Sequence, residues 1–122
     1  MTVILMPREG EDLQVNWWNW RPTLELFRAH SVLDEVKIEM IGANGTGVEA
    51  TEAEATFIAD FLNSYVERLG PNGRVRLDLT ITDEPDTFEL FRNDPENNYS
   101  ATVDWLRTLQ RFCLTSKGFK VV

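Results

Sequence analysis

The segment from Thr51 to Gly70 constrains the fold most, because it carries both a start and a stop signal for a helix. Thr51 and Glu54 fit a capping box, in which each side chain accepts a hydrogen bond from the other residue's backbone N–H. Gly70 and Pro71 are typical of the residues that follow a helix end. Between these signals the apolar residues recur at spacings of three and four: Phe57, Ile58, Phe61, Leu62, Tyr65 and Leu69. We therefore expect a long amphipathic helix here.

Strand patterns surround this helix. Apolar and polar residues alternate along residues 75–82, which predicts a strand with one buried face in an antiparallel sheet, with residues 87–91 as its returning partner. Residues 2–6 and 13–17 are expected to form a hairpin, and residues 119–122 a last short strand.

Two further helices are expected. Pro22 is placed at the first position of one helix, which would end near Asp34. Residues 36–40 then alternate like a strand, although a continuation of the helix to Met40 stays open. Ser100 is expected to cap the last helix, which would end at Gly118. Together these elements predict a single α+β domain over residues 1–122, with an antiparallel sheet covered by two or three helices.

Composition excludes several functional classes. The 122 residues carry 20 Asp and Glu against 12 Lys and Arg, a net charge of −8, which argues against direct binding to nucleic acid. No apolar run approaches the roughly 20 residues of a membrane span, and the N-terminus does not resemble a signal peptide. One Cys and one His make a zinc site improbable. We expect a cytoplasmic protein that uses no metal and no cofactor.

Three motifs resemble a family of small bacterial and phage proteins of unknown function. The first is the W-x-W-R-P segment at residues 18–22, and the second is the glycine loop at residues 44–48, Asn-Gly-Thr-Gly-Val, where the family carries an N-x-G-x-G loop. The third reads Leu109, Phe112, Ser116, Gly118 and Phe119, with Lys117 where the family usually has a glycine. The resemblance extends over most of the chain and implies a compact cytoplasmic protein, without supplying catalytic residues.

The most concentrated candidate site is a run of aromatic residues. Trp17, Trp18 and Trp20 lie within four positions, and Arg21 follows them. Tryptophan and arginine are enriched among the residues that dominate binding energy at protein interfaces, so Trp18, Trp20 and Arg21 are candidates for contact with a partner. The alternative is that the indole rings pack in the core and orient the helix that follows.

Acidic residues supply the second candidate. Asp83, Glu84 and Asp86 occupy a turn, where they are expected either to be solvated or to attract a basic partner. Their spacing does not match a calcium-binding loop. His30 is expected on an apolar helix face, and Cys113 reads as a buried small residue.

We therefore expect a non-enzymatic domain that binds a protein partner, in particular an immunity-type or phage-encoded inhibitor of a basic protein such as a nuclease. Two alternatives stay open. One is a small hydrolase-like enzyme that uses a pair of carboxylates, with His30 beside them. The other is a homo-oligomeric assembly module, so that both a monomer and a homodimer remain compatible with the sequence.

Overall fold

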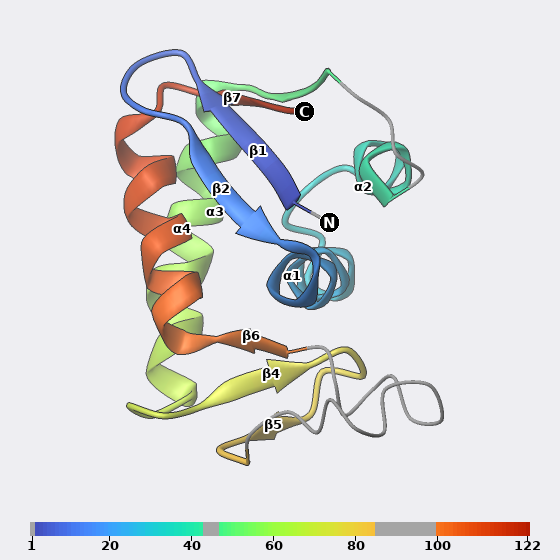
Figure 1. Cartoon of the computed structure of the whole chain (residues 1–122), viewed down its shortest axis with the longest axis vertical. Helices are drawn as coiled ribbons and strands as arrows, with labels where there is room; N and C mark the ends of the chain where they lie inside the picture. The colour runs from blue at the N-terminus through green and yellow to red at the C-terminus, as the bar shows by residue number, and fades with distance from the viewer. Residues whose placement is uncertain (1, 43–46, 85–99) are drawn as a thin grey trace.

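Figure 1 shows the computed structural model of the chain, which describes residues 2–42, 47–84 and 100–122. These residues form one α+β domain with antiparallel sheets, as the sequence predicts. The described part of the chain contains four α-helices: α1 (Trp17–Ala29), α2 (Glu35–Gly42), α3 (Glu52–Tyr65) and α4 (Val103–Thr115). A short 3-10 turn, η1 (Val66–Arg68), extends α3.

The larger sheet joins the two ends of the chain. Its strands are β1 (Thr2–Pro7), β2 (Leu13–Asn16), β3 (Val48–Ala50) and β7 (Phe119–Val121). Their order is β2-β1-β7-β3, and every neighbouring pair is antiparallel. The expected hairpin and the expected last strand are therefore confirmed, whereas the sequence did not predict β3.

A second, smaller sheet corrects the prediction for residues 75–82. Its order is β5-β4-β6, formed by β4 (Arg74–Arg76), β5 (Ile81–Thr82) and β6 (Ser100–Thr102). The alternating segment is thus a tight hairpin and not one strand. It turns at Leu79, whose φ is +72°, and the Asp78 carboxylate accepts a hydrogen bond from the Thr80 N–H at 3.0 Å. The expected partner strand at 87–91 lies outside the described residues.

The helices connect the two sheets. In Figure 1, α3 and α4 run side by side along the left of the molecule, with the larger sheet near their upper end and the smaller sheet at their lower end. α1 lies between the sheets and packs against β6.

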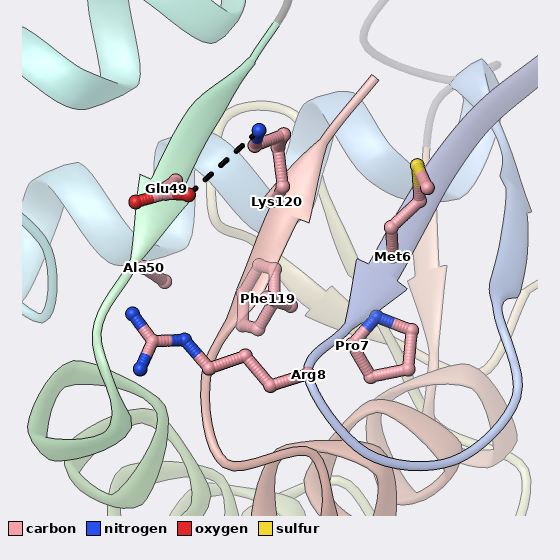
Figure 2. A pocket seen from close by; sticks show the side chains of 7 residues that line it. All are labelled: Met6, Pro7, Arg8, Glu49, Ala50, Phe119 and Lys120. Carbon is pink, nitrogen blue, oxygen red and sulfur yellow. Dashed lines mark ion pairs between the residues drawn. The ribbon is translucent and has the colours of Figure 1, made fainter.

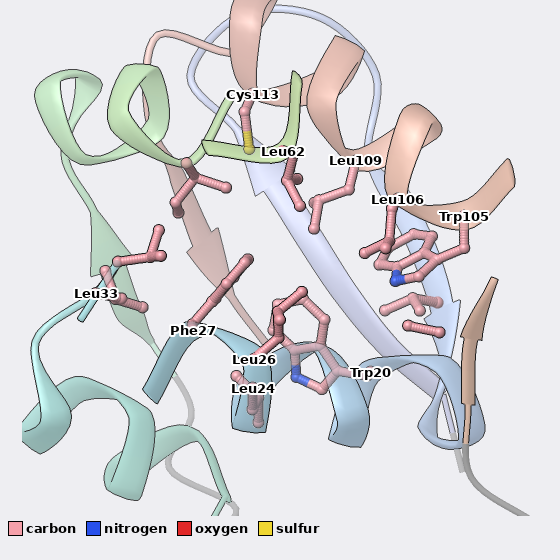
Figure 3. Packing of buried hydrophobic residues seen from close by; sticks show 14 of the residues in the cluster. Trp20, Leu24, Leu26, Phe27, Leu33, Leu62, Trp105, Leu106, Leu109 and Cys113 are labelled. Carbon is pink, nitrogen blue, oxygen red and sulfur yellow. The ribbon is translucent and has the colours of Figure 1, made fainter. Parts of the chain in front are cut away.

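The core is built where α1 faces α3 and α4. Figure 3 shows Trp20 and Phe27 of α1 directed toward side chains of the two long helices, among them Leu62 and Leu109. Buried residues of both sheets belong to the same cluster, Val3 in the larger and Val75 in the smaller. The two sheets therefore share one core.

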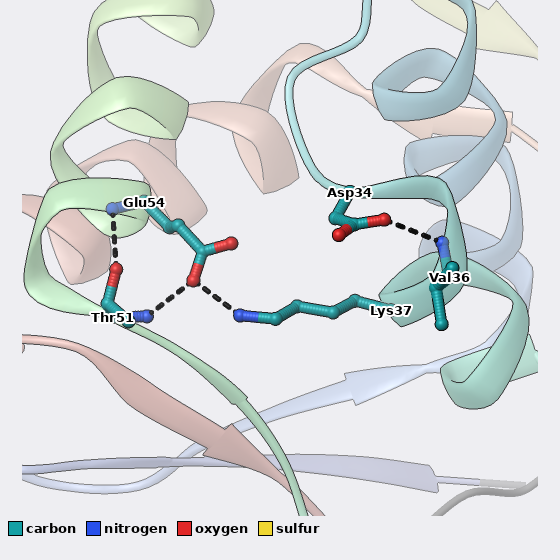
Figure 4. Close-up of polar contacts among 5 residues, drawn as sticks. All are labelled: Asp34, Val36, Lys37, Thr51 and Glu54. Carbon is teal, nitrogen blue, oxygen red and sulfur yellow. Dashed lines mark hydrogen bonds and ion pairs between the residues drawn. The ribbon is translucent and has the colours of Figure 1, made fainter.

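The capping box of α3 is confirmed. The Thr51 hydroxyl accepts the Glu54 N–H at 3.1 Å, and the Glu54 carboxylate accepts the Thr51 N–H at 3.0 Å. Figure 4 shows that the same carboxylate also accepts a hydrogen bond from the Lys37 ammonium of α2, at 2.6 Å. This ion pair fixes α2 against the start of α3.

The first helix differs from its prediction at both ends. Asn16 caps α1 by accepting the Asn19 N–H at 2.8 Å, so the helix begins at Trp17 and Pro22 lies in its second turn. Proline has no backbone N–H, so one hydrogen bond of the helix is missing at Pro22. The helix ends at Ala29, and not near Asp34, because Ser31 takes a φ of +53°.

Residues 36–40 are helical, but they do not continue α1. They belong to α2, a separate helix after the break at Ser31. Val36, Ile38 and Met40 alternate like a strand in the sequence, but the buried residues are Ile38 and Ile41, three positions apart, as in a helix.

The cap of the last helix also differs from the prediction. Ser100 lies in β6, and it is the Thr102 hydroxyl that accepts the Trp105 N–H, at 3.2 Å, so α4 begins at Val103. Both residues have the short hydroxyl side chain that caps helices, which is why the sequence alone misplaces the cap by two positions.

Candidate functional site

The tryptophan segment lies mostly inside the molecule. Trp20 is 1% exposed and forms an edge-to-face pair with Trp105, with ring centroids 6.4 Å apart and an interplanar angle of 77°. Trp20 therefore packs in the core and cannot touch a partner while the protein is folded, which corrects its assignment as a contact residue. Trp17 is partly buried against the same core.

The other two residues of this segment lie at the surface of α1. Trp18 is partly buried and Arg21 is exposed. Arg21 lines a small depression of about 180 Å³, whose remaining walls come from α1 and α2: Trp17, Leu24, Glu25, Arg28 and Ile38. Trp18 does not line this depression, but it lies three positions from Arg21 on the same helix.

The predicted acidic residues lie elsewhere. Asp83 and Glu84 follow β5. This strand lies at one edge of the smaller sheet, whereas α1 contacts β6 at the other edge. Both are exposed, and Glu84 lies 3.8 Å from the Arg76 guanidinium. Asp86 falls outside the described residues. Asp83 lines a pocket of about 440 Å³ together with Thr102, whose N–H donates to the Asn19 side chain of α1 at 3.4 Å.

A different cluster forms a surface cleft that is rich in aromatic side chains. The aromatic cleft, about 330 Å³ in volume, lies between the end of α1 and the outer side of α3. Its lining residues are His30, Phe57, Phe61, Ser64, Tyr65 and Arg68.

The rings of the aromatic cleft form a continuous row. Phe61 and Tyr65 are stacked with centroids 5.5 Å apart and an interplanar angle of 16°. The His30 ring lies 5.1 Å from Phe61 and 5.8 Å from Tyr65. Phe57 continues the row toward the solvent and is 55% exposed. A partner or ligand would therefore meet an apolar surface that is already ordered by ring contacts.

The helix geometry explains the position of each ring. Phe57, Phe61 and Tyr65 are spaced by four residues and thus lie along one side of α3. His30 reaches this side because α1 ends at Ala29, directly before it. Ser64 and Arg68 share the same helical side, one turn apart.

The ionisable groups of the aromatic cleft include a permanent cation and a neutral phenol. The Arg68 guanidinium carbon lies 5.6 Å from the centroid of the Tyr65 ring. Burial raises the pKa of the Tyr65 hydroxyl, an effect that the nearby Arg68 charge partly offsets, so Tyr65 is a neutral phenol at neutral pH. The lining includes no Asp or Glu. The aromatic cleft therefore does not assemble the carboxylate pair that the enzymatic alternative places beside His30.

The segment that carries most of the aromatic cleft has a net negative charge. Residues 35–68 contain seven acidic and two basic side chains, a net charge of −5 out of −8 for the chain. Three of the seven acidic residues are paired with lysines: Glu54 with Lys37, Glu52 with Lys117 and Glu49 with Lys120. The aromatic cleft thus lies on a segment that is acidic overall, with Asp60 and Glu67 exposed on α3 and η1, which also carry its phenylalanine and tyrosine rings and Arg68.

A second pocket lies on the uncovered face of the larger sheet. Figure 2 shows this pocket, of about 210 Å³, bordered by Met6, Arg8 and the ion pair between Lys120 and Glu49 at 3.8 Å. Mixed polar and apolar side chains are ordinary on the solvent face of an antiparallel sheet. We therefore give this pocket less weight than the aromatic cleft.

The described residues also bear on metal binding, thiol reactivity and membrane insertion. They contain no group of three or more His, Cys, Asp or Glu side chains that could hold a metal ion. Burial raises the pKa of the Cys113 thiol to about 12, which keeps it protonated and unreactive at neutral pH. Among the helices in the described ranges, none is long and apolar enough to cross a membrane.

The sequence pattern identifies the residues of α3 but places all of its apolar side chains in the core. A signal for the cleft is present, because Phe57 and Ile58 are adjacent and cannot both point to the centre of one buried face. The position of His30 has no such signal, since it depends on where α1 ends. Comparisons of the chain with protein-family models, curated proteins and solved structures found no match.

Proposed function

We propose that this protein is a non-enzymatic binding domain that recognises a basic protein partner through the aromatic cleft. The observation that carries the proposal is the cleft lined by the row of exposed Phe57, partly buried Phe61 and buried Tyr65, on a segment with a net negative charge. Aromatic side chains supply much of the binding energy of protein interfaces, whereas surrounding charges mainly set the association rate and the choice of partner.

The charge distribution favours a basic partner over a second copy of the chain. A symmetric dimer through this surface would bring the exposed acidic residues next to the rings, Asp60 and Glu67, close to those of the other copy. Like charges in an interface are unfavourable, while a basic surface would be attracted to it. A basic nucleic-acid-processing enzyme has this chemistry, so an immunity-type or phage-encoded inhibitor is the specific form of the proposal.

A peptide-display selection tests the proposal, because a random library samples many combinations of basic and aromatic residues. Peptides would be selected on the wild-type protein and on the double variant Phe57→Ser, Phe61→Ser. We expect the wild type to enrich peptides that combine basic and aromatic residues, and the double variant to lose this enrichment.

Matched controls separate the aromatic cleft from other apolar surface. Leu114 of α4 is 56% exposed, almost the same fraction as Phe57, but lies outside the aromatic cleft. Leu114→Ser should leave the selection unchanged. Circular dichroism would first establish that each variant is folded. If the double variant enriched the same peptides as the wild type, the proposal would be wrong, and loss of enrichment in Arg21→Ala would instead point to α1.

A further inference from the structure

We infer that the aromatic cleft takes an aromatic side chain with a carboxylate beside it, held by Arg68 and His30, inside an otherwise basic partner segment. This inference rests on the proposed function and specifies the chemistry of the residues that enter the cleft. It predicts that the partner segment places one acidic group within the cleft, while the partner residues around the cleft are basic.

The first observation is that Arg68 has no acidic partner in the described part of the chain. All three lysines of the protein pair with glutamates: Lys37 with Glu54, Lys117 with Glu52, and Lys120 with Glu49. Arg68 instead lies over the Tyr65 ring, and no ion pair to it is found among the described residues. Its guanidinium therefore remains able to bind a carboxylate with two parallel hydrogen bonds.

The second observation concerns His30, which lines the same cleft as Arg68. Its imidazole contacts the rings of Phe61 and Tyr65, and its side chain makes no hydrogen bond within the described ranges. A neutral imidazole has one N–H donor and a protonated one has two. His30 can thus donate to a bound carboxylate in either state.

The third observation is the size and lining of the cleft. A volume of about 330 Å³ is near the lower end of the roughly 300–1,000 Å³ that small-ligand pockets occupy. This space suits one or two side chains and not a whole helix. With ring faces on α3 and no carboxylate in the lining, the complementary group combines a ring with a negative charge.

Three short peptides test the inference: Lys-Arg-Phe-Glu-Lys-Arg, the same peptide with Gln in place of Glu, and the same peptide with Ala in place of Phe, all with blocked ends. Binding would be measured by titration of the ¹⁵N-labelled protein, following the backbone amide shifts of His30, Phe57 and Arg68. Simple attraction to the acidic surface predicts tighter binding of the Gln peptide, since it has one more net positive charge. We expect the opposite, with the Gln peptide binding about fivefold more weakly than the Glu peptide.

Variants of the protein identify the groups responsible. Arg68→Gln should abolish the preference for Glu over Gln, whereas Arg68→Lys should retain part of it. Arg107→Gln is the matched control, because Arg107 is an exposed arginine of α4 outside the aromatic cleft and should leave the preference unchanged.

The outcomes distinguish the inference from the proposed function. If both ring-containing peptides shift the cleft amides but the Gln peptide binds equally or more tightly, the inference is overturned and the proposed function stands. If neither ring-containing peptide shifts these amides, or if the Ala peptide binds as well as they do, both are overturned.

Discussion

The hydroxyl of Thr23 connects two segments that are 82 residues apart in the sequence. It accepts the indole N–H of Trp105 at 2.9 Å and donates to the Asn19 carbonyl oxygen at 2.7 Å. Thr23 is fully buried, so no water can replace it as the acceptor. A buried donor without a partner costs about 1–3 kcal/mol. We therefore expect Thr23→Val to lower the free energy of unfolding by about this amount.

A double-mutant cycle would isolate this bond. In a Trp105→Phe background the donor is absent, so Thr23→Val should cost less than it does in the wild type, by about 1 kcal/mol. Urea unfolding of the four proteins measures the difference. Equal costs in both backgrounds would show that the Thr23 hydroxyl contributes through Asn19 alone.

Gly118 shows a second effect at the residue scale, the close approach of two backbones. Its φ is +100°, and an added Cβ would lie 2.8 Å from the Ala50 carbonyl oxygen. Gly10 has nearly the same φ, +101°, but open space around it. We expect Gly10→Ala to cost about 1–2 kcal/mol for the backbone conformation alone. Gly118→Ala should cost clearly more, because β7 must also move away from β3. Urea denaturation would compare the two variants, and similar costs would contradict the predicted clash.

These residues also show what the sequence can and cannot reveal. Gly118 belongs to the closing motif, and its position after the last helix is visible as a stop signal. Its close approach to Ala50 is not visible in the sequence, because this approach depends on the pairing of β7 with β3. Trp20 is similar: an aromatic cluster is compatible with both packing and binding, and only the position of α4 places Trp105 against it.

At the scale of elements, the end of α1 has the hydrogen bonds of a Schellman motif. The Val32 N–H donates to the Phe27 carbonyl at 3.0 Å, and the Ser31 N–H donates to the Arg28 carbonyl at 3.3 Å. Ser31 holds the left-handed position, with φ of +53°, where glycine is usual. Serine at this position removes the signal by which the sequence would have marked the helix end.

Ser31→Gly should therefore stabilise the protein. Glycine adopts a positive φ without the steric cost that serine has, which predicts a gain of about 0.5–1 kcal/mol in the free energy of unfolding. A rise of the midpoint by a few degrees in thermal unfolding would be the readout. Ser31→Ala serves as the control and should give no gain, since alanine also disfavours this conformation. A lower midpoint for Ser31→Gly would contradict the assignment.

The contact between α2 and α3 makes a pH-dependent contribution to stability. Partial burial alone would raise the pKa of Glu54, but hydrogen bonds from Lys37 and Thr51 together with the Lys37 charge lower it below its ordinary value of 4.5. A carboxyl group with a lower pKa in the folded state stabilises the protein above its unfolded pKa. This contribution is lost as the pH falls through the folded pKa.

We expect Glu54→Gln to reduce the free energy of unfolding by about 0.5–1 kcal/mol near pH 7, and the difference from the wild type to vanish in strong acid. Gln can still accept the Thr51 N–H, so the variant mainly removes the charge. Urea unfolding between neutral and acidic pH gives this profile. Glu52→Gln is the control, because its pair with Lys117 is longer, 3.7 Å, and more exposed. A wild-type advantage that persists in acid would contradict the role of the ionised carboxylate.

The elements that the sequence predicts well are those with local signals at both ends. The α3 helix has its capping box and its glycine stop within one segment, and the first hairpin has an apolar strand on each side of a polar turn. The hairpin at 74–82 has no glycine at its turn, because Leu79 takes the positive φ, so its alternation predicts a single strand. For the aromatic cleft, the adjacent Phe57 and Ile58 indicate only that one ring leaves the core, while the place of His30 depends on how α1 and α3 pack.

At the scale of the whole molecule, the two sheets share one core and should unfold together. Cys113 reports on this property, because it is buried where α4 meets the rest of the core and is the one cysteine of the chain. Burial raises the pKa of its thiol to about 12, so the native state contains almost no reactive thiolate at about pH 8. A thiol reagent should therefore modify Cys113 only after the protein opens.

We expect the opening that exposes Cys113 to be global unfolding. The free energy derived from the rate of labelling with a disulfide reagent should then equal the free energy of unfolding from urea titration followed by circular dichroism. The alternative is that α4 separates locally from α3, which would give a smaller free energy for labelling. Because β6 leads directly into α4 and also pairs with β4, such a separation would break the smaller sheet as well. The shared core therefore predicts that Thr23→Val, near β6, lowers both free energies equally, although Thr23 and Cys113 lie on different elements. A change in the urea value without a change in labelling would show that the two ends of the molecule unfold independently.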